Sequence, residues 1–378
     1  MKNSLFILLA VFAMACTNKP KVIVEIENIS ATDRVGEIIE VSWESLDTLH
    51  TTSFIVKNEK GEEVPSQIIY NGDENPQTLI FPASVVANSK ENYTIVAGIP
   101  AEFPVRTFGR QIPERKDDFA WENDRIAFRM YGPALANENP SNGIDIWLKK
   151  TENLIVDKFY KEELENGKSY HVDHGEGLDC YKVGHTLGAG GIAPFADGKI
   201  WVGDHYTTAR VLDSGTLRTT FELTYDSVKV NDKMLTQKII ISLDAGSQLN
   251  KALVSYTGES DSLQVAAGFT LHSGLNEIKA ADRNKGFLVY AEDAVSDAGV
   301  PAGRTYIGVV MASDMQQTFL DEEHMAGVAL YAPGSPLECY FGGGWSQWGF
   351  DSDADWFRYI ERFAENLKTP LKVNVRTK

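Results

Sequence analysis

The sequence predicts an all-β protein: a small N-terminal β-sandwich, then a large antiparallel sandwich or barrel, with a helix near the C-terminus. Runs in which apolar and polar residues alternate recur along the chain, as half-buried strands require. Turn-rich segments such as NEKGEE and NGDENPQ join these runs. The one clear helical periodicity, with apolar residues along a single face, spans residues 353–367.

The first 16 residues predict a lipoprotein signal peptide. A lysine precedes an apolar run from Leu5 to Ala15, which is too short to span a bilayer, and Cys16 follows. Residues 13–16, Ala-Met-Ala-Cys, resemble a bacterial lipobox, in which the cysteine is lipidated; the alternative is an ordinary signal cut near Ala15. Because no acidic run follows Cys16, we expect a lipid-anchored protein facing the periplasm, on the outer membrane, rather than one on the cell surface.

The net charge limits the kinds of binding partner, and the length of the chain limits the number of domains. A formal net charge of −17 argues against nucleic acid as a partner, because no basic patch would neutralise phosphates. We expect the lipid anchor to be the only contact with a membrane. The length favours two domains, residues 17–110 and 111–378. Cys180 and Cys339 either form a disulfide or stay free, and we favour free thiols.

The expected elements follow in chain order. The small sandwich has strands at residues 21–28, 37–43, 53–58 and 93–98, and a charged linker or first wrap follows at 110–124. The larger domain has strands at residues 125–132, 143–150, 216–225, 238–244, 251–258, 264–272, 286–293, 304–312, 327–333 and 337–344. A short helix is expected at 157–167. The helix 353–367 packs Trp356 and Ile360 on the core, with Asp353 as its cap.

Several stretches resemble a known family of unknown function. They are RIAFRMYGPAL, NGIDIWLKK, YHVDHGEGLDCYKVGHTLGAGG, SGTLRTTFELTY and SLDAGSQLNKALVSYTG. They are similar to an uncharacterised lipoprotein family encoded in polysaccharide-utilisation loci of Bacteroidota, itself related to the galactose-mutarotase-like β-supersandwich. The resemblance covers about residues 20–378. It implies a β-supersandwich for the larger domain and a carbohydrate context, without naming a reaction.

Residues 169–191 concentrate titratable side chains among six glycines. Three of the seven histidines, His171, His174 and His185, lie here, and a fourth follows soon after. Histidine titrates near neutral pH, and a tyrosine such as Tyr181 can donate a proton to a leaving oxygen. Glu176 lies between two glycines that free the backbone to place it unusually. These five residues are therefore the candidate catalytic groups for acid–base chemistry on a sugar.

Two other interpretations of this stretch stay open. The spacing of His171, Asp173 and His174 allows a divalent metal site, although it lacks the helical pattern that places two histidines on one face. A tight glycine turn with polar caps and no catalytic role is the second.

Candidate substrate-binding residues lie on the polar faces of three strands and near one late turn. Arg125, Arg129 and Tyr131 alternate with apolar residues, and two guanidinium groups on one face suit a carboxylate. The remaining candidates are Arg218, Glu222, His272 and Trp345, the last as a stacking platform after three glycines, whereas Trp348 is assigned to the core. A solvated outer face for the arginines and core packing for Trp345 are the structural alternatives.

The sequence thus predicts an enzyme that cleaves or modifies oligosaccharides containing uronic acid, either a polysaccharide lyase or a glycoside hydrolase. The alternatives are a glycan-binding lipoprotein without catalysis, which needs no tuned histidines, and a sugar epimerase or mutarotase, which leaves linkages intact.

Overall fold

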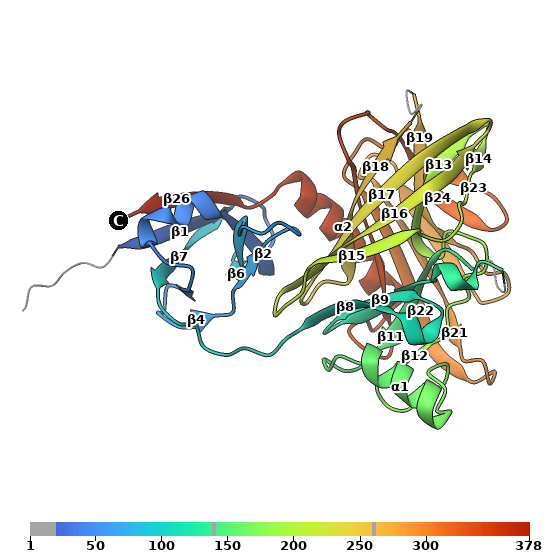
Figure 1. The fold of residues 1–378 in the computed structure, drawn as a ribbon, viewed down its shortest axis with the longest axis horizontal. Helices are drawn as coiled ribbons and strands as arrows, with labels where there is room; N and C mark the ends of the chain where they lie inside the picture. Colours follow the sequence, from blue (N-terminus) through green and yellow to red (C-terminus); the bar gives the residue numbers. More distant parts are fainter. Residues whose placement is uncertain (1–19, 138–140, 259–261) are drawn as a thin grey trace, which may run out of the picture.

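The computed structural model describes residues 20–137, 141–258 and 262–378, and these form two β-rich bodies (Figure 1). The fold is mostly antiparallel sheet with a C-terminal helix, so the expected fold class is confirmed. Cys16, the expected lipidation site, lies outside the described residues.

The small body is a sandwich of a five-stranded and a three-stranded sheet. The larger sheet contains, in spatial order, β26 (Lys372–Thr377), β1 (Lys21–Asn28), β7 (Ser89–Ala97), β3 (Phe54–Lys57) and β4 (Glu63–Val64). The smaller sheet contains β2 (Arg34–Ser42), β6 (Thr78–Val85) and β5 (Gln67–Ile69). Val22, Val24 and Ile26 point from β1 into the core between the sheets, because alternate residues of a strand face one side.

The chain ends in the small body, which corrects the expected extent of the second domain. β26 pairs antiparallel with β1, from Val22 opposite Thr377 to Glu27 opposite Lys372. At the other boundary, β8 (Thr107–Ile112) already pairs with β9 (Asp118–Asn123) in the larger body. The larger body therefore starts before residue 111, and the polypeptide crosses between the bodies twice.

The larger body contains three antiparallel sheets. The first contains β12 (Gly177–Asp179), β11 (Ile144–Lys149), β10 (Ile126–Met130), β9 and β8. The second contains β14 (Lys199–Ile200), β13 (Ala189–Ala196), β19 (Gln264–Thr270), β24 (His324–Leu330) and β23 (Gln317–Leu320). The eight-stranded sheet contains β15 (Thr208–Asp213), β16 (Arg218–Val230), β17 (Lys233–Asp244), β18 (Leu249–Thr257), β25 (Leu337–Trp345), β22 (Pro301–Met311), β21 (Phe287–Val295) and β20 (Ile278–Asp282).

The two faces of strand β10 pack against different parts of the protein: one faces the main core, and the other faces a helix beside the candidate site. Ile126, Phe128 and Met130 point into the main apolar core, as their alternation predicts. The opposite face lies under the helix α1 (Val156–Asn166), whose Phe159 and Tyr160 pack with residues of β9, β10 and β11. The arginine on this face is consequently buried by the helix instead of being solvated.

The second helix and the cysteines complete the larger body. Helix α2 (Asp353–Lys368) packs Trp356 and Ile360 against β21 and β22. Its N-cap is Ser352, whose side chain accepts the backbone N–H of Asp355, so the expected cap at Asp353 is off by one residue. Cys180 and Cys339 are both free. Across the described ranges, none of the helices combines the length and the apolar character of a membrane span.

Candidate functional site

His171 is the one predicted catalytic residue that the structure couples to a buried acid. Its side chain is 33% exposed, in the loop between α1 and β12. The ring Nδ1 lies 3.1 Å from the carbonyl oxygen of Asp179 and 3.4 Å from its carboxylate Oδ2. A carbonyl oxygen only accepts, so Nδ1 carries the proton and Nε2 remains the basic nitrogen. Asp297, on the loop after β21, approaches the same Nδ1 at 3.8 Å.

Behind His171, Arg129 joins two buried carboxylates. Its Nη2 lies 2.8 Å from Asp179 Oδ2 and 2.6 Å from Asp145 Oδ2. Its Nη1 donates to the hydroxyl of Tyr170 at 3.1 Å. The expected role of Arg129 in holding a substrate carboxylate is therefore corrected: the guanidinium is buried and already holds the carboxylates of this chain. In this site Arg129 holds the Asp179 side chain in place, and Asp179 in turn orients the His171 ring.

Burial and neighbouring charges act in opposite directions on the pKa of the buried acid. Burial and the negative charge of Asp145 raise the pKa of Asp179 well above its usual range, and Arg129 opposes them in part. Tyr131 lies under the guanidinium, with the Arg129 Cζ 4.7 Å from its ring centre. Burial, together with the Asp145 charge, raises the pKa of Tyr131, so its phenol stays protonated. We call His171, Asp179, Arg129 and Asp145 the His171 relay.

The other predicted catalytic residues are not gathered around His171. His174 is exposed, with Nε2 3.0 Å from the Ser169 carbonyl oxygen, and Glu176 forms an ion pair with Lys158. His185 is also exposed. Tyr181 is buried and donates to the carbonyl oxygen of Thr270 at 2.9 Å. The expected role of Tyr181 as a proton donor to a sugar is corrected, because its hydroxyl faces the core and burial raises its pKa.

The proposed metal ligands separate as well. Asp173 forms an ion pair of 2.5 Å with Lys150. Neither His171 nor His174 shares a contact with that carboxylate. Within the described parts of the chain, no group of three or more His, Cys, Asp or Glu side chains has the arrangement of a metal site.

His272 is held at both ring nitrogens. Nδ1 lies 2.9 Å from a carboxylate oxygen of Glu292, and Nε2 lies 2.7 Å from the carbonyl oxygen of Lys182. Because both partners only accept, the ring is the doubly protonated imidazolium. Burial lowers the pKa of His272, but the hydrogen bond and charge of Glu292 outweigh it and raise the pKa overall. The ring has no free nitrogen for a substrate, so its geometry favours a structural role.

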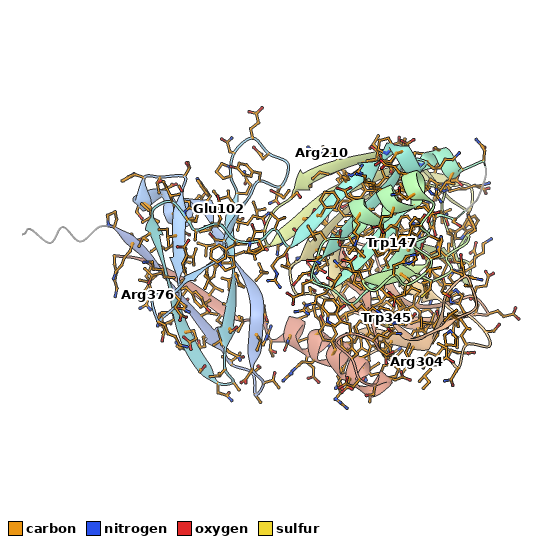
Figure 2. The ribbon with its side chains drawn as sticks, turned by 90° about the horizontal axis from the view of Figure 1, so that it is seen from below. Glu102, Trp147, Arg210, Arg304, Trp345 and Arg376 are labelled. Carbon is orange, nitrogen blue, oxygen red and sulfur yellow. The ribbon has the colours of Figure 1, made fainter. Side chains whose placement is uncertain are left out.

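The two tryptophans exchange their expected roles. Trp345 is 1% exposed, lies inside the larger body (Figure 2), and donates to the carbonyl oxygen of Ala302 at 2.6 Å. Trp348 is half-buried, and the Arg125 guanidinium carbon lies 5.2 Å from its ring centre. The stacking surface expected at Trp345 is therefore available at Trp348 instead, beside the partly exposed Arg125.

Arg218 and Glu222 lie apart from this surface. Arg218 contacts Asp244 and, across the boundary between the two bodies, Glu40, each at 2.5 Å. Glu222 pairs with Lys238 at 3.1 Å. Both residues are thus committed to ion pairs on β16, and the first stabilises the contact between the bodies.

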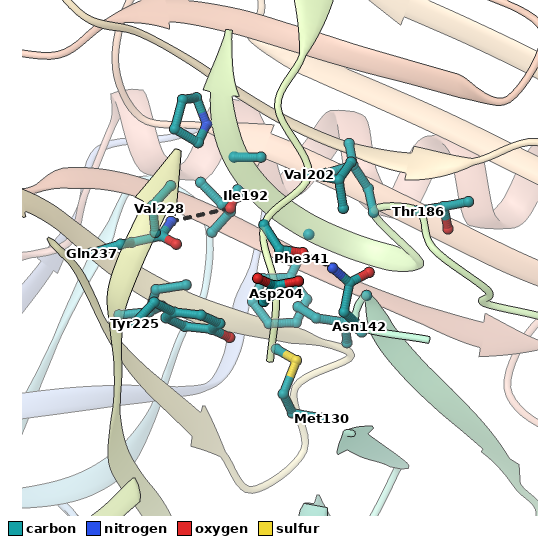
Figure 3. Close-up of a pocket in the computed structure, with 18 of the residues that line it drawn as sticks. Met130, Asn142, Thr186, Ile192, Val202, Asp204, Tyr225, Val228, Gln237 and Phe341 are labelled. Atoms are coloured by element: carbon teal, nitrogen blue, oxygen red, sulfur yellow. Dashed lines mark hydrogen bonds between the residues drawn. The ribbon is translucent and has the colours of Figure 1, made fainter. Parts of the chain in front are cut away.

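A separate cavity of about 40 Å³ lies between β13 and the eight-stranded sheet (Figure 3). Its walls include Asn142, Asp204, Ile192, Gln237 and Tyr225. Sequence analysis missed these residues because they come from five separated segments, and no pattern in any one segment indicates that they meet.

Most of the chain matches a family model. The description of that family is "Domain of unknown function (DUF4861)", and the match covers residues 26–373. A curated relative, "Uncharacterized protein P7" of Formosa agariphila, is 30% identical over 375 residues, which cover 94% of this chain and 93% of the relative. The chain belongs to the DUF4861 family.

Two solved structures share the fold of this DUF4861 protein. An α-mannosidase from Enterococcus faecalis V583 matches with a TM-score of 0.50 at 9% identity, over 95% of this chain and 46% of that chain. A glycosyl hydrolase family 38 protein from Enterococcus faecalis matches with a TM-score of 0.51 at 10% identity, over 96% and 48%. This chain spans less than half of either structure, and the likeness is one of fold.

Proposed function

We propose that this protein is an enzyme that cleaves oligosaccharides containing uronic acid, with His171 as its acid–base residue. The observation that carries the proposal is the His171 relay. A partly exposed imidazole has its Nδ1 proton fixed by Asp179, which Arg129 holds in turn. This arrangement leaves Nε2 as a base directed away from the buried acid, the logic by which enzymes orient a catalytic histidine. The likeness of the fold to glycosyl hydrolases supports a sugar substrate.

β-Elimination fits this centre better than hydrolysis. Hydrolysis commonly uses two carboxyl groups flanking the bond, whereas the relay has one exposed imidazole backed by a buried acid. In the proposed step, Nε2 of His171 takes the proton from C5 of the uronate. The electron pair of that C–H bond forms the C4–C5 double bond, and the C4–O bond breaks. The imidazolium then returns the proton to the leaving oxygen.

Recognition of the uronate is assigned to exposed cations near the loop of His171. Lys150 reaches Asp173 of that loop at 2.5 Å and Gln347 at 3.5 Å. Arg125 lies over the ring of Trp348, one residue further on. We propose that a sugar ring stacks on Trp348 while its carboxylate approaches Arg125 and Lys150. Asp297 beside His171 disfavours a second negative charge on that side of the ring.

The proposal is tested with His171→Ala on a panel of uronate-containing glycans. General acid–base catalysis contributes about 100-fold or more, so the variant should lose at least that factor in turnover. His174→Ala is the matched control, because His174 is exposed and contacts only the Ser169 carbonyl oxygen among the described residues. New ultraviolet absorbance of an unsaturated uronate identifies elimination, and new reducing ends without it identify hydrolysis. Equal turnover in both variants would remove His171 from the mechanism.

Glycan binding without catalysis is the second candidate, and the Trp348 surface is the feature that favours it. Calorimetry with the same panel distinguishes the two functions. Affinity that Trp348→Ala abolishes, together with no turnover in the unchanged protein, would support a binding protein and contradict the enzyme.

We further propose that Cys16 carries a lipid that holds the protein on the periplasmic face of the outer membrane. The signal-like residues before it support this location. Cys16→Ser should move the protein from the membrane fraction to the soluble fraction. The lipid anchor would be contradicted if Cys16→Ser stayed in the membrane fraction. The periplasmic location would be contradicted if protease added to whole cells cleaved the wild-type protein.

A further inference from the structure

The cavity between β13 and the eight-stranded sheet is built from an apolar wall and a polar rim. Met130, Ile192 and Phe341 supply apolar surface, and Asn142 and Asp204 lie next to each other among them (Figure 3). A volume of about 40 Å³ accommodates roughly three water molecules, or a small group of two or three heavy atoms. Asp204 is exposed and marks the side that opens to solvent.

Asn142 offers the cavity a hydrogen-bond acceptor that lacks a donor. The side chain is nine-tenths buried, and its Oδ1 has no hydrogen-bond partner among the residues that the structure describes. Its Nδ2 already donates to the carbonyl oxygen of Gly203. A buried acceptor left unpaired costs about 1–3 kcal/mol, so a ligand that donates a hydrogen bond here is stabilised.

The amide donors of the cavity are used inside the protein. The Nε2 group of Gln237 donates to the carbonyl oxygen of Ile192 and the hydroxyl of Tyr256. With the Asn142 amide also committed, these side chains offer acceptors, and Asp204 adds a negative charge. The Tyr225 hydroxyl, which burial keeps protonated, supplies one neutral group. A ligand with hydroxyl donors fits this lining, and a carboxylate does not.

We propose that this cavity binds the hydroxymethyl group of a neutral hexose unit. The CH₂ carbon packs on Ile192 and Phe341, and the hydroxyl donates to Asn142 Oδ1 near Asp204. This inference rests on the carbohydrate function proposed above and adds a requirement to it. The substrate then combines a uronate, held near Arg125, with a neutral hexose whose sixth carbon carries a free hydroxyl.

The test compares three forms of one sugar by ligand-observed NMR titration. Methyl glycosides of glucose, galactose and mannose are each used as the parent, the 6-deoxy sugar and the uronate. We expect one parent to bind, its 6-deoxy form to bind about tenfold more weakly for one lost hydrogen bond, and its uronate not to bind. Equal binding of the three forms would overturn the assignment. So would a crystal structure that shows only water in the cavity after soaking with the three parent glycosides.

Two variants locate the effect. Asn142→Leu should abolish the preference for the parent over the 6-deoxy sugar, and Asp204→Asn should allow the uronate to bind. Gln248→Leu is the matched control, because Gln248 is a buried amide with an unpartnered oxygen outside this cavity. If Gln248→Leu alters the preference as much as Asn142→Leu does, the cavity is not the site.

The titration is repeated on His171→Ala so that the two proposals fail separately. A preserved hexose preference without any turnover in the unchanged protein would contradict the catalytic proposal alone. Turnover of uronate glycans without a hydroxymethyl preference would contradict the cavity proposal alone.

Discussion

Arg129→Met is expected to destabilise the protein strongly, because it leaves two buried carboxylates without their cation. The guanidinium lies 2.6 Å from Asp145 and 2.8 Å from Asp179, and all three side chains are almost fully buried. Removing one partner of such a group costs about 3–5 kcal/mol. For a body of this size, 1 kcal/mol corresponds to about 2–4 °C in Tm, so we expect a loss of roughly 10 °C. Methionine keeps most of the apolar stem, so the loss reports the charge.

The pH dependence tests the electrostatic cause. Burial and Asp145 raise the pKa of Asp179 in the folded state, so the folded protein binds more protons than the unfolded chain. This contribution to stability is full below the unfolded pKa and is lost as pH rises through the folded pKa. Without Arg129 the Asp179 carboxyl group binds its proton more readily, so the deficit of Arg129→Met should shrink as pH falls.

Thermal and urea unfolding at acidic and alkaline pH measure the effect. Arg125→Met is the control, because Arg125 is one-third exposed and its ion pairs are 3.5 and 3.9 Å long. It should lose less than about 0.5 kcal/mol. A deficit for Arg129→Met that equals that of the control, or that does not vary with pH, would refute the reasoning.

Three further predictions concern the fold. The pKa of His272 is raised beside Glu292, so the stability that this pair contributes is present below the unfolded pKa of the histidine and is lost as pH rises through its folded pKa. Glu292→Gln should therefore lose most stability at acidic pH, as measured by urea unfolding. A loss of stability that is equal at all pH values would show that the pair does not contribute. Deleting residues 370–378 removes the partner of β1, so amide exchange should accelerate in β1 while β16 and β17 keep their protection; unchanged exchange in β1 would contradict this role. Trp345→Phe should cost about 1–3 kcal/mol, because the indole is buried and hydrogen-bonded, whereas Trp348→Phe should stay within about 0.5 kcal/mol; the reverse order in urea unfolding would contradict our assignment of the core.

Local patterns predicted the strands and helices well, because side-chain periodicity is a property of neighbouring residues. The apolar face of residues 125–131 and the helix 353–367 follow directly from it. The last strand carries the same signal in Val373 and Val375, yet nothing local indicates that its partner is β1 at the opposite end of the chain. Pairing between distant strands depends on the whole fold and has no signature in either segment.

The sequence likewise indicated some residues of the candidate site and not others. The cluster of histidines indicated the region in which the structure places His171 beside the buried Asp179. Arg125 and Arg129 share a face in the sequence pattern, but α1 covers Arg129 and leaves Arg125 partly exposed. Asp297 lies on a loop outside any motif, and Asn142 begins the family stretch NGIDIWLKK without any sign of a ligand contact, so no pattern of spacing could have singled them out.

The sequence by itself determined the β-rich architecture, the helix near the C-terminus and the region that holds His171, because alternation, period and composition are encoded within short segments. Only the tertiary structure decided that Arg129 and Trp345 are buried while Trp348 is partly exposed, that Tyr181 faces the core, and that the chain returns to pair with its first strand. The physical reason is that burial, hydrogen-bond partners and pKa depend on which distant segments cover a side chain.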